Sequence, residues 1–221
     1  MMLEDLRKEV VRMAMEAENQ GLCRRRSGNF SARDKDTGLM CITPSGKDRK
    51  FMRPEDIVVI DKTAHIAEAG TGQKPSSEVL MHLVAYEERA DIGAVAHTHS
   101  PFAMVFAALE RPIPGIVIEA IHLNTPGGKI PVVPFAPQGS DALADSIRGP
   151  IREGDAVLLG RHGALTVGRS LEDAVLKAEY VEELAKIAYR AYVLGGGTLP
   201  APLPQEVFAK SVRMPLNKDI R

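Results

Sequence analysis

Apolar residues recur at helical spacing in several parts of the chain, and these parts predict the helices. One such pattern covers residues 3–17, and Gly21 is a suitable residue to end it. The longest covers residues 170–194, with a serine as N-cap and a run of three glycines after its end. Further helices are expected at 74–86, 101–109 and 141–147.

Short apolar runs bounded by turn residues predict the strands. Residues 27–33 are turn-rich and lead into a short strand. Other strands are expected at 39–43, 57–61, 65–68, 93–99, 156–159 and 164–167, with strands or extended segments at 113–122 and 130–134. The many strand–turn–strand units favour an α/β fold in which helices pack on a largely antiparallel sheet. A single domain over residues 1–221 is expected, with a loosely ordered tail from about 198.

Composition and charge then narrow the class of protein. The 221 residues are 44% apolar and 26% charged, as in ordinary globular domains. The formal net charge is -1, so no basic excess is available to bind a nucleic-acid backbone. Aromatic residues make up 5% and tryptophan is absent, which also disfavours stacking of bases.

Several other classes of protein are disfavoured by what the chain lacks. Its two cysteines, Cys23 and Cys41, are too few for a disulfide framework and are expected to be reduced and partly buried. The charged N-terminal residues do not resemble a signal peptide, and no run approaches the ~20 apolar residues of a membrane span. No G-x-G-x-x-G motif links a strand to a helix. We therefore expect a cytoplasmic protein without a membrane partner.

Three histidines form the strongest chemical signal. His97 and His99 end a predicted strand, and residues two apart on a strand point to the same face. The pair could share one metal ion, although a buried histidine beside a surface histidine, with no metal, would have the same sequence pattern. His162 lies in a short connection between two apolar strands, where functional side chains are common. Three histidines with an open fourth position are typical of catalytic zinc.

Three small polar segments could bind a phosphate through backbone N–H groups. They are Ser27–Ser31, Thr43–Gly46 and Lys74–Glu78, the last at a predicted helix start. Ordinary turns and helix caps have the same composition. Glu78 could ligate the metal or act as an acid/base, although a solvated glutamate in a first helical turn is also common. His65 and His82 are expected to be structural.

Taken in order, these motifs resemble the class II aldolase/epimerase family over roughly residues 5 to 195. The resemblance implies a three-layer α/β/α domain, a homotetramer with sites at subunit interfaces, and Zn²⁺ or another divalent first-row metal. It implies that His97, His99 and His162 bind the metal, while Glu78 is the acid/base and a ligand in the resting state. It also implies a set of residues that bind the phosphate of a sugar phosphate, namely Gly28, Asn29, Thr43, Ser45, Gly46, Ser76 and Ser77.

The same resemblance implies cleavage of a ketose 1-phosphate to dihydroxyacetone phosphate and an aldehyde. Epimerase-like members carry an aspartate at the position of Glu78, which favours an aldolase. The tyrosines that serve the aldehyde end in fuculose-phosphate aldolases are missing from residues 116–120 and 193–221, so Glu119 or His122 is considered as a replacement proton donor. A 5-deoxypentulose 1-phosphate suits these departures at least as well as a fuculose phosphate.

Three alternatives stay open at this point. A methylthioribulose-1-phosphate dehydratase would use a similar three-histidine site, and a pentulose-phosphate 4-epimerase belongs to the same family. An adducin-like scaffold without catalysis is disfavoured, because a scaffold has no need of the intact set Glu78, His97, His99 and His162.

Overall fold

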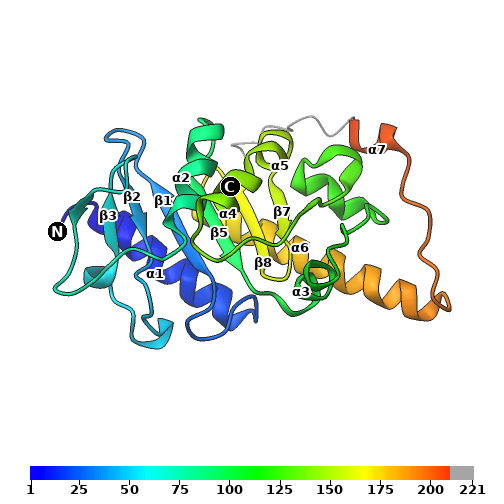
Figure 1. Ribbon diagram of the computed structural model, residues 1–221, viewed down its shortest axis with the longest axis horizontal. Helices are drawn as coiled ribbons and strands as arrows, with labels where there is room; N and C mark the ends of the chain where they lie inside the picture. The colour runs from blue at the N-terminus through cyan, green and yellow to red at the C-terminus, as the bar shows by residue number, and fades with distance from the viewer. Residues whose placement is uncertain (210–221) are drawn as a thin grey trace, which may run out of the picture.

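The structure, a computed structural model, describes residues 1–209 and is built on a sheet of eight strands (Figure 1). The strands lie in the order β4-β3-β2-β1-β5-β8-β7-β6, and every neighbouring pair is antiparallel except β6 with β7. Their bounds are β1 Asn29–Arg33, β2 Met40–Ile42, β3 Val58–Ile60, β4 Ile66–Glu68, β5 Ala94–Thr98, β6 Val132–Val133, β7 Ala156–Leu159 and β8 Gly163–Gly168. The largely antiparallel sheet is confirmed.

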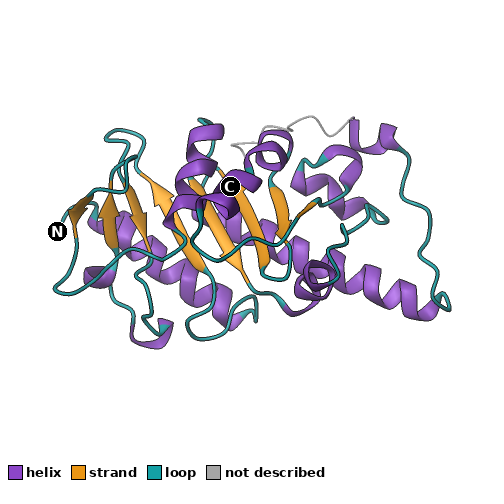
Figure 2. Ribbon diagram, in the orientation of Figure 1, coloured by secondary structure: helices purple, strands orange, loops and turns teal. Residues whose placement is uncertain are grey.

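Helices cover both faces of this sheet (Figure 2). The α-helices are α1 Glu4–Asn19, α2 Val79–Glu88, α3 Pro101–Ala108, α4 Asp141–Ser146, α5 Arg148–Glu153, α6 Leu171–Leu194 and α7 Gln205–Ala209. Short 3₁₀ helices are η1 Arg49–Phe51, η2 Pro54–Asp56, η3 Ile118–Leu123 and η4 Pro126–Gly128. Buried residues of α1, α3 and α6 pack on one face, and those of α2, α4 and α5 pack on the other, which confirms the three-layer α/β/α architecture.

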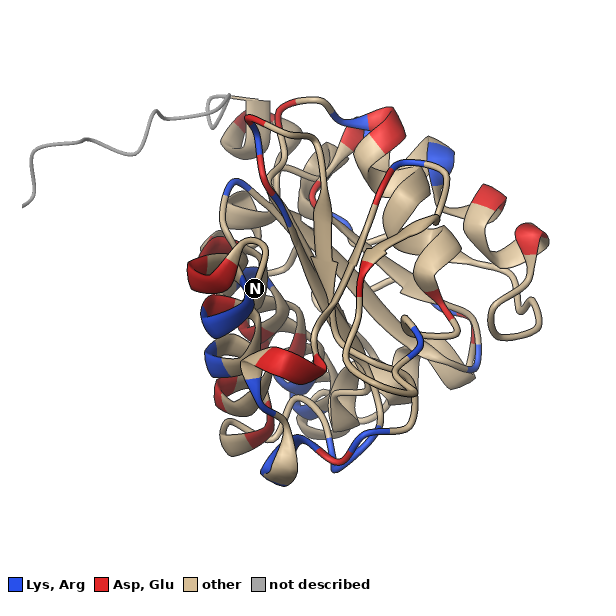
Figure 3. Ribbon diagram, turned by 90° about the vertical axis from the view of Figure 1, so that its left-hand side faces the viewer, with Lys and Arg blue, Asp and Glu red and all other residues tan. Residues whose placement is uncertain are grey.

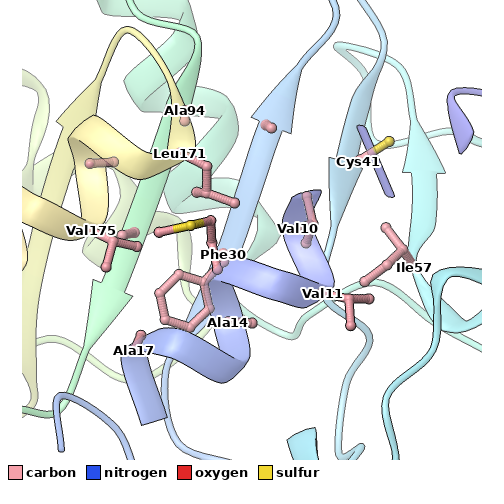
Figure 4. Close-up of a cluster of buried hydrophobic side chains, with 14 of the residues drawn as sticks. Val10, Val11, Ala14, Ala17, Phe30, Cys41, Ile57, Ala94, Leu171 and Val175 are labelled. Atoms are coloured by element: carbon pink, nitrogen blue, oxygen red, sulfur yellow. The ribbon is translucent and has the colours of Figure 1, made fainter. Parts of the chain in front are cut away.

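Alternation along the central strands divides the core between the two faces. Phe30 of β1 and Ala94 of β5 contact the α1 and α6 side, where Ala14 and Val175 complete the cluster in Figure 4. Ser31, the next residue of β1, points to α2 instead, as the two-residue period of a strand requires. Lysine, arginine, aspartate and glutamate are concentrated on the outer helices and loops in Figure 3. Within the described residues, no helix is long and apolar enough to cross a membrane.

One predicted helix begins later than expected. Residues 74–76 are extended, because Pro75 forms an isolated antiparallel bridge with Pro44. The backbone N–H of Ser45 donates to the carbonyl of Lys74, and that of Ser76 to the carbonyl of Thr43. Helix α2 therefore starts at Val79, after a turn that contains Ser76 and Glu78.

The segment around 113–122 also differs from its prediction. Only Ile113 pairs with Ile130, in an isolated bridge, and residues 118–123 form the 3₁₀ helix η3. Pro112 and Pro114 flank Ile113 and cannot donate hydrogen bonds to a longer ladder. The periodicity also missed α5, which follows the expected helix at 141–147 directly.

The predicted tail contains a helix as well. Residues 205–209 form α7, and the ring of Phe208 is buried against Gly128. Residues 210–221, the rest of that predicted tail, lie outside the described residues. Cys23 and Cys41 are both free and buried, as expected.

Candidate metal and phosphate site

Sheet topology brings the chemical motifs to one end of the sheet. Strand β5 carries His97 next to its last residue, Thr98, and the chain continues to His99, while its neighbours β1 and β8 run in the opposite direction. The first residues of β1 and β8 therefore lie beside the last residues of β5. Asn29 pairs directly with His97, and the β7–β8 turn brings in His162.

The three histidines converge: the pair His97 and His99, which the spacing placed on one face, is joined by His162 from the β7–β8 turn. One ring nitrogen from each of His97, His99 and His162 lies within 4.8 Å of the others. The ring centroids are 4.8, 4.8 and 5.1 Å apart, and the rings meet edge to face. His97 is fully buried, while His99 and His162 are partly buried, so the cluster has one open side.

Hydrogen bonding fixes the orientation of His97. Its Nδ1 lies 2.9 Å from the carbonyl oxygen of Ala164 and donates to it, because a carbonyl can only accept. In a neutral imidazole, Nε2 then carries a lone pair that points into the cluster. This Nε2 atom lies 3.0 Å from Nε2 of His99. A carbonyl behind a ligating histidine is a usual arrangement in metal sites.

Glu78 closes the cluster from the α2 side. Its Oε2 lies 3.3 Å from Nε2 of His97, and its Oε1 lies 3.1 Å from Nε2 of His162. The side chain is 2% exposed, and no described residue donates a well-formed hydrogen bond to Oε1. Lone pairs of an imidazole and a carboxylate at these distances repel each other unless a cation or a proton lies between them. The donor set of three imidazoles and one carboxylate therefore fits a divalent first-row metal.

The protonation states also suit a metal. Burial lowers the pKa of His99 to about 3, with further lowering by the charges of His97 and His162. Burial likewise lowers the pKa of His162. Burial by itself would raise the pKa of Glu78, but a proton on Nε2 of His97 that bonds the carboxylate, with help from His162 and Asn29, lowers it to about 2, and a metal cation would act in the place of that proton. At neutral pH, His99 and His162 are neutral and the carboxylate is ionised, which are the forms that bind metals.

Two of the predicted phosphate segments lie side by side. The bridge between Pro44 and Pro75 places Thr43 and Ser45 next to Ser76. The hydroxyl of Thr43 accepts the backbone N–H of Phe30, and that of Ser76 accepts the N–H of Glu78, so each hydroxyl still has its own proton to donate.

Glycine is required at the third segment. A Cβ atom on Gly28 would lie 2.5 Å from the carbonyl oxygen of His97, and its φ of +74° also favours glycine. Gly46 has a φ of +70° at the turn after Ser45. A Cβ atom on Gly139 would lie 2.5 Å from the carbonyl oxygen of Ser77, so the backbone of Ser77 faces the loop before α4.

Asn29 has a role that its motif did not reveal. Its Nδ2 donates to Oε2 of Glu78 at 2.8 Å, and its Oδ1 lies 2.6 Å from Nε2 of His82. One N–H of the Asn29 amide is left for a ligand. His82 is buried and hydrogen-bonded, as the sequence analysis expected.

Arg49 is a further residue of the site that the sequence analysis missed. Its guanidinium is 2% exposed and donates to the backbone carbonyls of Arg25, Ser27 and Gly28, which fastens the loop that carries Gly28. No spacing could have found it, because an arginine among Lys47, Asp48 and Lys50 has the pattern of a surface turn.

The two residues considered as proton donors lie elsewhere. Glu119 and His122 belong to η3, which packs against α6, and His122 stacks on Tyr180 with centroids 4.6 Å apart. Among the described residues, no hydrogen bond, ion pair or ring contact joins either one to the histidine cluster.

Comparisons with known proteins agree on one family. The family described as Class II Aldolase and Adducin N-terminal domain matches residues 8–189. A 5-deoxy-D-ribulose 1-phosphate aldolase of Bacillus thuringiensis serovar kurstaki is 32% identical over 206 residues, which is 93% of each chain. A 5-methylthioribulose-1-phosphate/5-deoxyribulose-1-phosphate aldolase of Rhodospirillum rubrum is 37% identical over 206 residues, 93% of this chain and 90% of that one. A solved structure of L-fuculose 1-phosphate aldolase superposes with a TM-score of 0.87 at 32% identity and covers 96% of both chains.

Proposed function

Because this chain belongs to the class II aldolase and adducin N-terminal domain family, we propose that it cleaves a ketose 1-phosphate to dihydroxyacetone phosphate and an aldehyde. One observation carries the proposal: the ring nitrogens of His97, His99 and His162 converge beside the buried carboxylate of Glu78. These residues would hold Zn²⁺, with Glu78 as a ligand before substrate binds. The ion supplies a Lewis acid for the oxygen that gains charge as the C3–C4 bond breaks.

Glu78 has the chemistry of the acid/base in this reaction. Cleavage turns the C4 hydroxyl into the aldehyde carbonyl, which releases one proton, and leaves a carbanion-like C3 on the phosphate-bearing fragment, which must gain one. Among the described residues no well-formed hydrogen bond reaches Oε1 of Glu78, so the ionised carboxylate is free to take up a proton and deliver it to C3, and no proton is gained or lost overall. Asn29 keeps the other oxygen fixed, which holds Oε1 on the side of His162, 3.1 Å from its Nε2.

The phosphate would bind beside the histidines. We assign it to the predicted set of Gly28, Asn29, Thr43, Ser45, Gly46, Ser76 and Ser77. The bridge between Pro44 and Pro75 and the contact of Gly28 with the backbone of His97 support this assignment. A phosphate held there would keep the reacting carbons in register with Glu78.

The substrate range and the assembly are extensions of the proposal. The names of the relatives favour a 5-deoxypentulose, 5-methylthiopentulose or fuculose 1-phosphate. We propose one domain over residues 1–221 and a homotetramer with sites at subunit interfaces. Apolar side chains exposed at the C-terminal end of α6 support an interface there, namely Tyr189, Tyr192, Val193 and Leu194. A cytoplasmic location stays a prediction.

A coupled assay for dihydroxyacetone phosphate tests the proposal. The panel holds 5-deoxyribulose, 5-methylthioribulose, L-fuculose and L-rhamnulose 1-phosphates, with Zn²⁺, with a chelator, and with Glu78→Gln. Glu87→Gln is the matched control, because it makes the same change on an exposed part of α2. We expect the release of dihydroxyacetone phosphate to require the metal, to fall in Glu78→Gln and to be unaffected in Glu87→Gln.

Other outcomes identify the alternatives. A dehydrated diketone phosphate as the product would indicate the dehydratase, and a 4-epimerised pentulose phosphate the epimerase. No bound metal and no turnover of any substrate would leave the adducin-like scaffold and refute the proposed function.

A further inference from the structure

A row of polar side chains crosses the otherwise apolar layer between the sheet and α2. Asn29 and Ser31 are two residues apart on β1, and His82 and Tyr86 are four residues apart on α2, so each pair points the same way. Ser31 and His82 are fully buried, and Asn29 and Tyr86 are 6% and 7% exposed. The row begins at Glu78, one helical turn before His82.

Four hydrogen bonds connect these side chains in series. Nδ2 of Asn29 lies 2.8 Å from Oε2 of Glu78, and Oδ1 of Asn29 lies 2.6 Å from Nε2 of His82. Nδ1 of His82 lies 2.7 Å from Oγ of Ser31, which lies 2.9 Å from the hydroxyl of Tyr86. Every polar atom of the His82 ring is therefore in use.

The donors and acceptors that each side chain offers fix which atom donates in all four hydrogen bonds. An ionised carboxylate only accepts, so the Asn29 amide group must present Nδ2 to Glu78 and Oδ1 to His82. Oδ1 also only accepts, so Nε2 of His82 carries the proton. A neutral imidazole then has its lone pair on Nδ1, which accepts from Ser31, and the Ser31 oxygen is left to accept from Tyr86.

We propose that His82 is a positioning residue, which locks the Asn29 amide in the orientation that donates to Glu78 and thereby holds the Glu78 carboxylate toward the histidine cluster. The role of Glu78 in catalysis rests on the proposed function, whereas the direction of the hydrogen bonds does not.

Reversal of the Asn29 amide shows how His82 supports its orientation. A flipped amide would set Oδ1 against the Glu78 carboxylate, which is repulsive, and Nδ2 against Nε2 of His82, whose proton would then have to move to Nδ1 while the Ser31 hydroxyl turned away. If His82 were replaced by an apolar residue, only one of these two constraints would remain. Burial lowers the pKa of His82 to about 3, so the ring keeps its neutral form and its single proton throughout the neutral range.

The test compares two substitutions in the full-length protein loaded with Zn²⁺. His82→Leu removes the donor to Asn29. His82→Gln keeps one, because the glutamine amide can donate to Asn29 and accept from Ser31. Thr166→Val is the control for the loss of a fully buried polar group, since the hydroxyl of Thr166 donates to the backbone carbonyls of Ala96 and Ala174 and, within the described part of the chain, to no side chain of the site.

Nuclear magnetic resonance provides a readout that does not depend on activity. Long-range ¹H–¹⁵N spectra should show His82 in the Nε2–H form. The Asn29 side-chain amide protons should exchange slowly in wild type, His82→Gln and Thr166→Val, and rapidly in His82→Leu. An Nδ1–H form, an imidazolium, or slow exchange in His82→Leu would overturn the inference.

Kinetics provide the second readout. We expect kcat to fall about 10- to 100-fold in His82→Leu with little change in KM, to be largely restored in His82→Gln, and to be unchanged in Thr166→Val. An unchanged kcat in His82→Leu would refute the positioning role. If wild type itself releases no dihydroxyacetone phosphate, the proposed function fails, and the spectra still decide whether His82 orients Asn29.

Discussion

Gly163 lies where the histidine cluster leaves no room for a side chain, so Gly163→Ala tests the geometry of the site. A Cβ atom there would lie 2.3 Å from the carbonyl oxygen of Thr98 and 3.2 Å from ring carbons of both His97 and His99. Since Cβ contacts below 3.0 Å do not occur, β5 and β8 must separate by about 0.7 Å at this point. Metal sites tolerate changes in ligand distance of only about 0.2 Å.

We therefore expect Gly163→Ala to lower Zn²⁺ affinity about 10- to 100-fold, in the range of other changes behind metal ligands. Overpacking should also lower the free energy of unfolding of the metal-free protein by about 1–3 kcal/mol. Competition with a chromophoric chelator measures the first quantity, and urea denaturation measures the second.

Gly149→Ala is the matched control, because no atom of residues 1–209 outside the backbone of α5 itself lies within 4 Å of its Cβ position. The same substitution there should stabilise the helix by about 0.5–1 kcal/mol and leave Zn²⁺ affinity unchanged. Equal Zn²⁺ affinities for wild type and Gly163→Ala would refute the reasoning that packing at this glycine sets the positions of the histidines.

The remaining predictions concern pH, the Gly28 loop and metal removal. Because burial lowers the pKa of His82 to about 3, the unfolded chain binds this proton first as pH falls below 6.5, and stability is lost in that direction. Between pH 7 and pH 5 the free energy of unfolding of wild type should therefore fall about 2 kcal/mol more than that of His82→Gln. Urea denaturation at both pH values measures this, and an equal fall in the two proteins would contradict it. Arg49→Met removes three hydrogen bonds to the loop that carries Gly28. It should raise KM for the sugar phosphate about tenfold at nearly constant kcat. A fall in kcat at constant KM would show that the Gly28 loop does not act through substrate binding. Chelation should abolish release of dihydroxyacetone phosphate and lower the free energy of unfolding by about 3 kcal/mol relative to protein with free Zn²⁺ at 100 times Kd. A thermal midpoint that does not change on chelation would argue against metal binding in the folded state.

Local periodicity predicted most elements of the fold. The sheet and the helices α1, α3 and α6 lie close to their predicted positions, because each buries a stripe or a face that the sequence pattern displays. The errors occur where pairing between distant segments overrides local preference. Lys74 to Ser76 have the composition of a helix start, but they pair with residues 43–45 and are extended. Ile113 lies between two prolines that prevent a continuous ladder.

The candidate site divides in the same way. The spacing of His97 and His99 was enough to place them on one side, because residues two apart on a strand share a face. The sequence also identified the glycine- and serine-rich segments and Glu78. The order of strands in the folded sheet, which spacing does not reveal, places β1 and β8 beside β5 and so brings Asn29 and His162 to that pair.

The tertiary structure likewise decided which buried side chains support the site. His82 faces Asn29, and Arg49 reaches the loop of Gly28, through contacts between segments far apart in the chain. Such contacts depend on the order of strands and on the layer in which each helix packs, and spacing along the chain carries neither. Spacing reports which face a side chain occupies, and the fold alone determines what it meets there.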